Sequence, residues 1–257
     1  MAKIWNTALG ECLITLDVGR HHGKTAAMFS SSGVSVLTTS DVDSTSDEEP
    51  TAEIWNAASG ALMARLIGHN RKVETAVFSS NDVSVVTSSR DTTARIWNAD
   101  GGKSVMTLAG HVAGVFSAVF SPDDTLVATA SADMTTKLWN ATSGECLLTL
   151  VSPENVVDQY ENYAVFSADG SQVLTLGGGL ARIWSSASGA CLAKFHTDSD
   201  NCWRAIYSSD SILVVGKWSD DTVRIWSAAS GELLLTLDWH CDEVYSVLGC
   251  SSVLCCS

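Results

Sequence analysis

A tryptophan-containing segment that recurs six times constrains the fold of this chain more than any other feature. Each copy is a short stretch that ends in tryptophan followed by asparagine or serine, and the six residues are Trp5, Trp55, Trp97, Trp139, Trp184 and Trp226. Most neighbours in this series are separated by about 42 residues, which is the period of repeat architectures built from four-stranded units. Each such unit buries its faces only against its neighbours.

The copy at residues 111–150 shows what one unit contains. Its first two apolar stretches, 115–121 and 125–131, flank a turn-forming Pro-Asp-Asp sequence. Two further stretches, 134–140 and 145–150, are separated by the sequence ATSG. Alternating or apolar runs bounded by turn residues are typical of strands. We therefore expect four short strands, joined by tight turns, in one antiparallel sheet per unit.

The units resemble WD repeats over essentially the whole chain. The most specific match is Gly110-His111 followed by Ser131, Asp133 and Trp139. The Trp-Asp pair that gives the repeat its name is Trp-Asn in four units and Trp-Ser in two. The resemblance implies a β-propeller, in which small four-stranded sheets pack as blades around a central channel.

In WD repeats a tetrad of polar residues fastens the incoming loop of a blade to its third strand. An imidazole, a hydroxyl, a carboxylate and an indole N–H can satisfy one another's hydrogen bonds in series. The resemblance implies two complete tetrads, which are His69, Ser89, Asp91 and Trp97, and then His111, Ser131, Asp133 and Trp139. Other units depart from it, with Gly177-Gly178-Gly179 in place of one Ser-x-Asp turn and Trp218 at another serine position.

The strand count predicts how the ring closes. The chain begins with a third and a fourth strand, at residues 2–6 and 11–16, and ends with a first and a second, at 244–248 and 253–257. We expect a single domain over residues 1–257: an all-β, six-bladed β-propeller of four-stranded antiparallel blades, its last blade closed by strands from both termini. Closure removes open sheet edges. The turn residues between its second and third strands are missing, which leaves open that the chain is an excerpt of a longer one.

Charge restricts the class of partner. The formal net charge is -14 and the sequence pI is about 4.6, so generic attraction to phosphate backbones is absent and we expect no nucleic-acid binding. The one basic cluster, Asn70-Arg71-Lys72 with Arg90, is either a solvated rim or a contact for an acidic protein segment. No stretch is long enough to span a membrane and no signal-peptide core is present. We expect a monomer in the cytoplasm, with the nucleus as the alternative, and no secretion.

Cysteines and catalytic motifs indicate neither a cofactor nor an enzyme. Cys12, Cys146 and Cys191 share one register of the fourth strand in three units, so the repeat accounts for them. The remaining cysteines lie between Cys202 and Cys256 without a CxxC spacing, and we expect no metal site. There is no phosphate-binding glycine loop and no Gly-x-Ser-x-Gly elbow.

Aromatic residues that break the repeat mark the expected binding surface. Alignment of the first strands makes Glu74, Phe116 and Trp203 equivalent, and Tyr245 follows a valine as Phe116 does. In WD-repeat propellers this position opens onto the rim of the channel. We expect the partner-binding residues to be Phe116, Trp203, Trp218, Trp239, Tyr245, Glu74 and Arg90, because aromatic anchors bury large areas in interfaces. Alternatively, Trp218 and Trp239 fill holes left by the missing tetrads.

An acidic insertion, DVDSTSDEEP at residues 41–50, accounts for the longer separation of Trp5 and Trp55. Ser44 and Ser46 each have an acidic residue three positions later, which makes them candidate phosphorylation sites. A calcium loop would need a glycine where Ser46 stands and a glutamate where Ala52 stands. The insertion is otherwise a solvated loop.

The predicted function is therefore a non-enzymatic scaffold that binds a peptide or protein segment on the propeller face near the channel mouth. The first alternative is a sensor or regulatory propeller module excerpted from a larger signalling protein. The second is a substrate-receptor subunit of a ubiquitin ligase, although no Trp-Asn or Trp-Ser pair is followed two positions later by the arginine of the family's adaptor-binding box. A fold constrains function only loosely.

Overall fold

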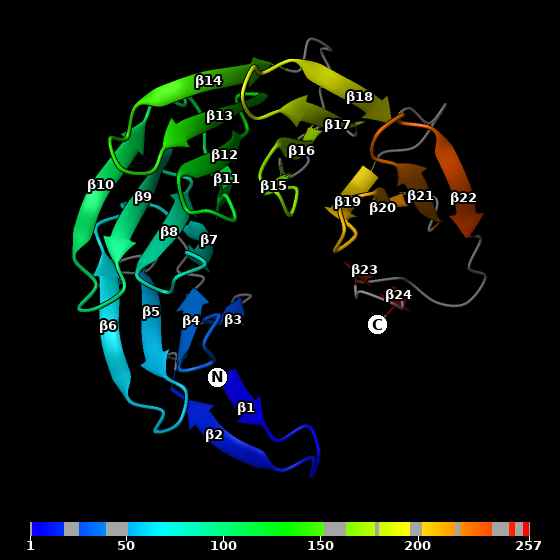
Figure 1. The fold of residues 1–257 in the computed structure, drawn as a ribbon. Coiled ribbons are helices and arrows are strands. Elements are labelled where there is room, and N and C mark those ends of the chain that lie inside the picture. Colours follow the sequence, from blue (N-terminus) through cyan, green and yellow to red (C-terminus); the bar gives the residue numbers. More distant parts are fainter. Residues whose placement is uncertain are drawn as a thin grey trace. The chain divides into compact units, whose positions relative to one another are not determined.

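The structure is a computed structural model that describes residues 2–17, 26–39, 51–151, 163–177, 180–195, 202–218, 222–237, 247–249 and 254–256. Every regular element in these ranges is a β-strand, so they contain no helix that could cross a membrane (Figure 1). The chain forms two compact units, Met1–Val127 with Asn140–Glu145, and Ala128–Trp139 with Cys146–Ser257. A single domain over the whole chain stays a prediction.

Within the described ranges, five sheets have four antiparallel strands in chain order, and these are the blades. Blade one contains β3 (Ala27–Phe29), β4 (Ser35–Thr39), β5 (Thr51–Asn56) and β6 (Leu62–Ile67). Blade two contains β7 (Val73–Phe78), β8 (Ser84–Ser89), β9 (Thr93–Asn98) and β10 (Ser104–Ala109). Blade three contains β11 (Val115–Phe120), β12 (Leu126–Ser131), β13 (Thr135–Asn140) and β14 (Cys146–Val151).

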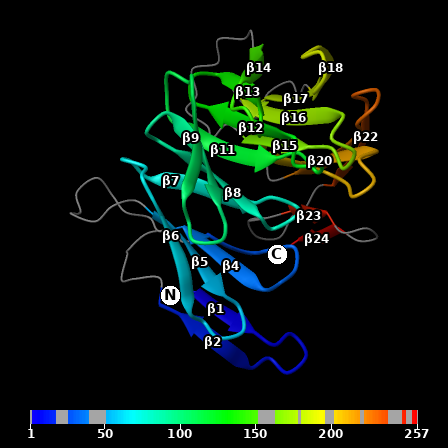
Figure 2. The ribbon, with the colours of Figure 1, turned by 60° about the vertical axis from the view of Figure 1, so that its left-hand side comes forward.

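The two remaining blades follow the same plan. Blade four contains β15 (Tyr163–Phe166), β16 (Gln172–Gly177), β17 (Leu180–Ser185) and β18 (Cys191–Phe195). Blade five contains β19 (Cys202–Tyr207), β20 (Leu213–Trp218), β21 (Val223–Ser227) and β22 (Leu233–Leu237). Two further sheets have two strands each, and they are β1 (Ala2–Trp5) with β2 (Cys12–Leu16), and β23 (Val247–Gly249) with β24 (Leu254–Cys256). Figure 2 shows the same strands after a turn of 60°.

The turn between the third and fourth strands explains why asparagine can replace aspartate after the tryptophan. In blade one the Oδ1 atom of Asn56 accepts hydrogen bonds from the backbone N–H groups of Ala58 and Ser59 at 3.0 and 2.9 Å. Asn140 makes the same pair of bonds in blade three. The amide oxygen satisfies the turn as a carboxylate oxygen would, since only an acceptor is needed.

Hydrophobic cores lie between neighbouring blades. In the first unit, Trp97 of blade two is 1% exposed and packs into one cluster with Leu37 and Leu66 of blade one. In the second unit, Trp226 of blade five packs against Phe195 of blade four, with ring centroids 5.7 Å apart. Each of these two tryptophans thus buries its ring against the preceding sheet, as stacked repeats require.

Trp5 differs from the other repeat tryptophans, because 53% of it is exposed. Within the described residues β1 pairs only with β2, so no second strand or preceding sheet covers the ring. The Nζ atom of Lys3 lies 5.7 Å from its centroid instead. A structural role for Trp5 would need a neighbour outside the described residues.

In the first compact unit, aspartates in the turn between the first and second strands of a blade accept hydrogen bonds from the preceding blade. Asp82 of blade two accepts hydrogen bonds from the backbone N–H groups of Ser31 and Ser32 in blade one at 2.7 and 2.8 Å. Asp124 likewise accepts bonds from the backbone N–H and hydroxyl of Ser80 at 2.8 and 2.7 Å. Burial would raise the pKa of Asp82, but the hydrogen bonds from Ser32 and Ser31 outweigh it and lower the pKa.

Replacing Asp82 by alanine is expected to lower the free energy of unfolding by about 1–2 kcal/mol, because two charge-assisted hydrogen bonds between blades are lost. Asp82 has a left-handed backbone with φ 60°, which disfavours alanine but not glycine. Asp82→Gly should therefore be more stable than Asp82→Ala by about 1 kcal/mol. Urea denaturation of both variants checks this, and an unchanged midpoint for Asp82→Ala would show that the contact contributes nothing.

Candidate functional site

The buried polar network of blade two lies next to the candidate surface and sets its geometry. The indole Nε1 of Trp97 donates to the Thr87 hydroxyl at 2.8 Å. That hydroxyl lies 2.7 Å from Nε2 of His69, whose Nδ1 lies 2.8 Å from Oδ2 of Asp91. For a neutral ring, the consistent assignment has Thr87 donating to Nε2 and the Nδ1–H group donating to Asp91. The imidazole and carboxylate are 0% and 4% exposed.

Hydrogen bonding keeps Asp91 ionised in this network. Burial would raise the pKa of Asp91, but the hydrogen bonds from His69 and Thr93 outweigh it and hold the pKa well below its usual range. Thr93 contributes both its backbone N–H and its hydroxyl, at 3.0 and 2.6 Å. The turn before β9 is therefore held firmly, and Arg90 is part of that turn.

Arg90, Glu74 and Phe116 meet at one end of the first unit. The guanidinium Nε of Arg90 donates to Oε1 of Glu74, and its Cζ lies 5.8 Å from the centroid of the Phe116 ring. The Nζ atom of Lys72 lies 3.5 Å from the other carboxylate oxygen of Glu74. We call Lys72, Glu74, Arg90 and Phe116 the rim cluster.

Backbone contacts hold the rim cluster together. The backbone N–H of Arg90 donates to the carbonyl oxygen of Lys72 at 3.0 Å. A β-carbon placed on Gly114, just before β11, would lie 3.2 Å from Cα of Arg90. The Thr75 hydroxyl accepts a hydrogen bond from the backbone N–H of Ala118 at 3.3 Å, which joins β7 to β11.

A β-bulge orients the first residue of the cluster. The register of β7 with β8 shifts between Val73 and Thr75, so Glu74 is the extra residue. The register of β19 with β20 shifts in the same way between Cys202 and Arg204, which makes Trp203 the extra residue of blade five. Bulges redirect a side chain and are over-represented at functional sites. Glu74 and Trp203 therefore occupy equivalent positions in the backbone.

Comparison with known proteins identifies the repeat. The sequence profile described as "WD domain, G-beta repeat" of the WD40 family matches residues 60–98 and 102–140. The crystal structure of the computationally designed Ika8 protein is similar with a TM-score of 0.81 and 23% identity, over 99% of this chain and 73% of that chain. Residues 60–98 and 102–140 are therefore WD repeats, and the chain as a whole has the fold of a β-propeller. No curated protein sequence matches it significantly.

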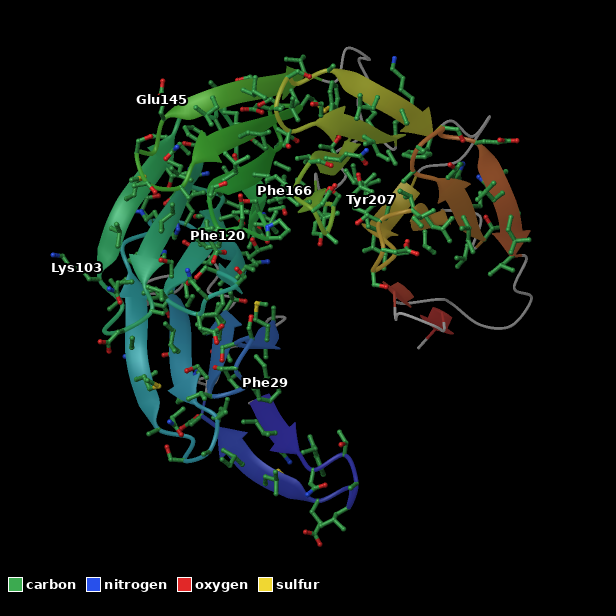
Figure 3. All side chains as sticks on the ribbon, viewed as in Figure 1. Phe29, Lys103, Phe120, Glu145, Phe166 and Tyr207 are labelled. Carbon is green, nitrogen blue, oxygen red and sulfur yellow. The ribbon has the colours of Figure 1, made fainter. Side chains whose placement is uncertain are left out.

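The six-bladed β-propeller predicted from the repeat is confirmed as the fold class. Five complete blades and two two-stranded sheets fit six WD-repeat blades. The pairing of strands from the two termini into the last blade stays a prediction. Figure 3 labels aromatic residues at the ends of first strands, namely Phe29, Phe120, Phe166 and Tyr207. Propellers of this family generally act as protein-interaction scaffolds and not as enzymes.

The structure corrects the sequence analysis on which residue supplies the hydroxyl of the blade-two tetrad. The family resemblance predicts Ser89 beside His69 and Trp97, but the structure puts Thr87 there. The hydroxyl of Ser89 instead donates to the carbonyl oxygen of Arg71 at 2.9 Å and accepts from the backbone N–H of Asp91 at 3.1 Å. The physical reason is position along the strand. Thr87 and Ser89 lie two residues apart on the same face of β8, and only Thr87 is within reach of the indole.

Blade three repeats this correction. The indole of Trp139 donates to the Thr129 hydroxyl at 2.8 Å, whereas Ser131 accepts from the backbone N–H of Asp133 at 3.1 Å. His111 is buried, with 6% of its surface exposed. The recurrence of threonine at one position of the second strand is the signal that could have revealed these acceptors, and its members are Thr38, Thr87, Thr129 and Thr175.

Several expected site residues lie outside what the structure describes. Trp203 and Trp218 are placed as backbone in β19 and β20, where Trp218 pairs with Cys202, but their side chains are not described. Trp239 and Tyr245 lie outside the described residues, as do Ser44 and Ser46 of the acidic insertion. Within the described ranges, no three His, Cys, Asp or Glu side chains gather as metal ligands would.

Proposed function

We propose that this protein is a non-enzymatic scaffold that binds a peptide or protein segment on the propeller face carrying the rim cluster. The observation that carries the proposal is the contact of Arg90 with both Glu74 and Phe116. It places a charged group and an aromatic ring together at a β-bulge. Arginine and aromatic residues are the types most often found as energetic anchors of protein interfaces.

The geometry of the rim cluster supports this use. The Arg90 side chain is 52% exposed, whereas its Glu74 partner is only 11% exposed. The buried carboxylate therefore holds an arginine that remains accessible to solvent. A side chain that is already ordered loses less entropy on binding. Because Trp203 is the corresponding bulge residue, we include it in the proposal as a second anchor.

The proposal is tested by capture of partners from a cell lysate with the immobilised full chain. We expect Phe116→Ala and Trp203→Ala to lose partners that the wild type retains, since each removes an aromatic anchor. Phe29→Ala is the matched control, because Phe29 is a 52% exposed aromatic residue at the opposite end of a first strand. Circular dichroism establishes that each variant is folded. Equal retention by all three variants would overturn the proposal.

A further inference from the structure

A small group of cations lies on an otherwise acidic protein, and it indicates what kind of partner would bind the rim cluster. The chain has 29 acidic and 15 basic residues, not counting histidine. Arg71 and Lys72 precede β7, and Arg90 lies in the turn whose backbone donates to the Lys72 carbonyl. The Ser89 hydroxyl ties the Arg71 carbonyl to the same turn. These two hydrogen bonds hold the backbones of the three basic residues close together.

Arg90 is oriented by two neighbours and still has donors available. Glu74 accepts from the Nε side of the guanidinium, and Phe116 lies against its face. A guanidinium has five N–H donors, of which one belongs to Nε. Within the described residues, the structure shows no hydrogen bond to the Nη atoms of Arg90. Because the Arg90 side chain is 52% exposed, these Nη atoms can donate to the two oxygens of a carboxylate.

We infer that the rim cluster recognises an acidic protein segment in which an apolar residue adjoins aspartate or glutamate. A carboxylate of the segment binds the Nη edge of Arg90 beside Lys72, and the apolar side chain covers the exposed part of the Phe116 ring. Glu74 is a positioning residue that holds the guanidinium and does not touch the partner. This inference rests on the proposed function and specifies its partner.

Electrostatics favours a short acidic segment over an extended polyanion. At physiological ionic strength, charges interact over about 8 Å, so a short segment interacts chiefly with Lys72, Arg90 and their neighbours. A long polyanion would also be repelled by the rest of the protein, because the net charge of the chain is -14. Specific binding through an exposed arginine should weaken with salt, as rim charges do.

The experiment measures fluorescence anisotropy of a labelled peptide in which a leucine is flanked by two glutamates on each side. A peptide with glutamines in their place and one with phosphoserines in their place are the comparison probes. We expect the glutamate peptide to bind the full chain, and Arg90→Gln and Phe116→Ala each to weaken it by about tenfold or more. Arg90→Lys should be intermediate, because it keeps the charge and loses the fork.

Arg65→Gln provides a matched control for Arg90→Gln. Arg65 is 58% exposed and its Nε lies 3.1 Å from a carboxylate oxygen of Glu53, which is 11% exposed. It therefore has the same kind of ion pair without the neighbouring Phe116 ring. Equal loss of affinity in both variants would overturn the inference, because any exposed arginine would then suffice. Binding of the phosphoserine peptide alone would also overturn it, since carboxylates would not be the ligand.

The outcome also separates this inference from the proposed function. If Phe116→Ala loses lysate partners but the glutamate peptide does not bind the wild type, the scaffold stands and the acidic partner is wrong. If Phe116→Ala and Trp203→Ala retain every partner, the proposed function itself fails. Thermal melts of all the variants show whether any loss comes from unfolding.

Discussion

Replacing Trp97 by alanine is expected to lower the free energy of unfolding by about 3–5 kcal/mol. The ring is 1% exposed and belongs to the core shared by blades one and two. Its removal leaves a cavity between the blades and also deprives the Thr87 hydroxyl of its indole donor. Urea denaturation followed by circular dichroism measures the change.

Trp5 offers an internal control at the same repeat position. Because 53% of Trp5 is exposed, Trp5→Ala should change the unfolding free energy by only about 1 kcal/mol or less. A similar loss in both variants would show that Trp5 is buried in the folded protein. A small loss for Trp97→Ala would contradict the inter-blade core.

Replacing Asp91 by asparagine is expected to lower the free energy of unfolding at pH 7 by about 1–3 kcal/mol, because the buried hydrogen bonds from His69 and Thr93 lose their ionised acceptor. The effect should depend on pH in a defined direction. The pKa of Asp91 is lowered in the folded protein, so its ionised form stabilises the fold at any pH above the unfolded pKa, about 3.9. That contribution is lost as the pH falls from there toward the folded pKa.

Chemical denaturation of wild type and Asp91→Asn between pH 7 and about pH 3 tests the direction of this dependence. The two proteins should differ most near pH 7, and the difference should shrink below about pH 4. The variant lacks only the Asp91 carboxyl group, so any pH dependence that both proteins share comes from other groups. Parallel stability curves across the range would show that Asp91 does not couple folding to protons.

The repeat pattern made the fold predictable from local information. Strands of alternating polarity around turn residues, a tryptophan in every unit and an asparagine or serine after it are each visible within one unit. Stacked repeats are also quasi-one-dimensional, so identifying one unit identifies its neighbours. The equivalence of Glu74 and Trp203, predicted by alignment, has its structural counterpart in the matching bulges.

The candidate site was only partly predictable. The sequence places Arg90 and Glu74 in it and Phe116 on the same rim, but it does not predict their mutual contact. That contact depends on how β11 sits beside β7, which the hydrogen bond from Ala118 to Thr75 establishes. A single sequence contains no signal for a contact between side chains of two different repeats.

The hydroxyls of the tetrads show a different limit. Family resemblance points to Ser89, yet Thr87 lies within hydrogen-bonding reach of both Trp97 and His69. The choice is made by small differences in distance between two residues on the same face of one strand. Sequence spacing alone does not distinguish them, although the recurrence of threonine does.

The sequence by itself determined the repeat, the strand order and the six-bladed propeller, because these follow from hydrophobic periodicity and turn chemistry within each unit. Only the tertiary structure decided that Thr87 accepts the indole bond, that Asp82 joins two blades and that Arg90 lies between Glu74 and Phe116. Those contacts connect residues from different strands or different repeats. They are set by strand register and by the packing of one sheet on the next, which no short stretch of sequence encodes.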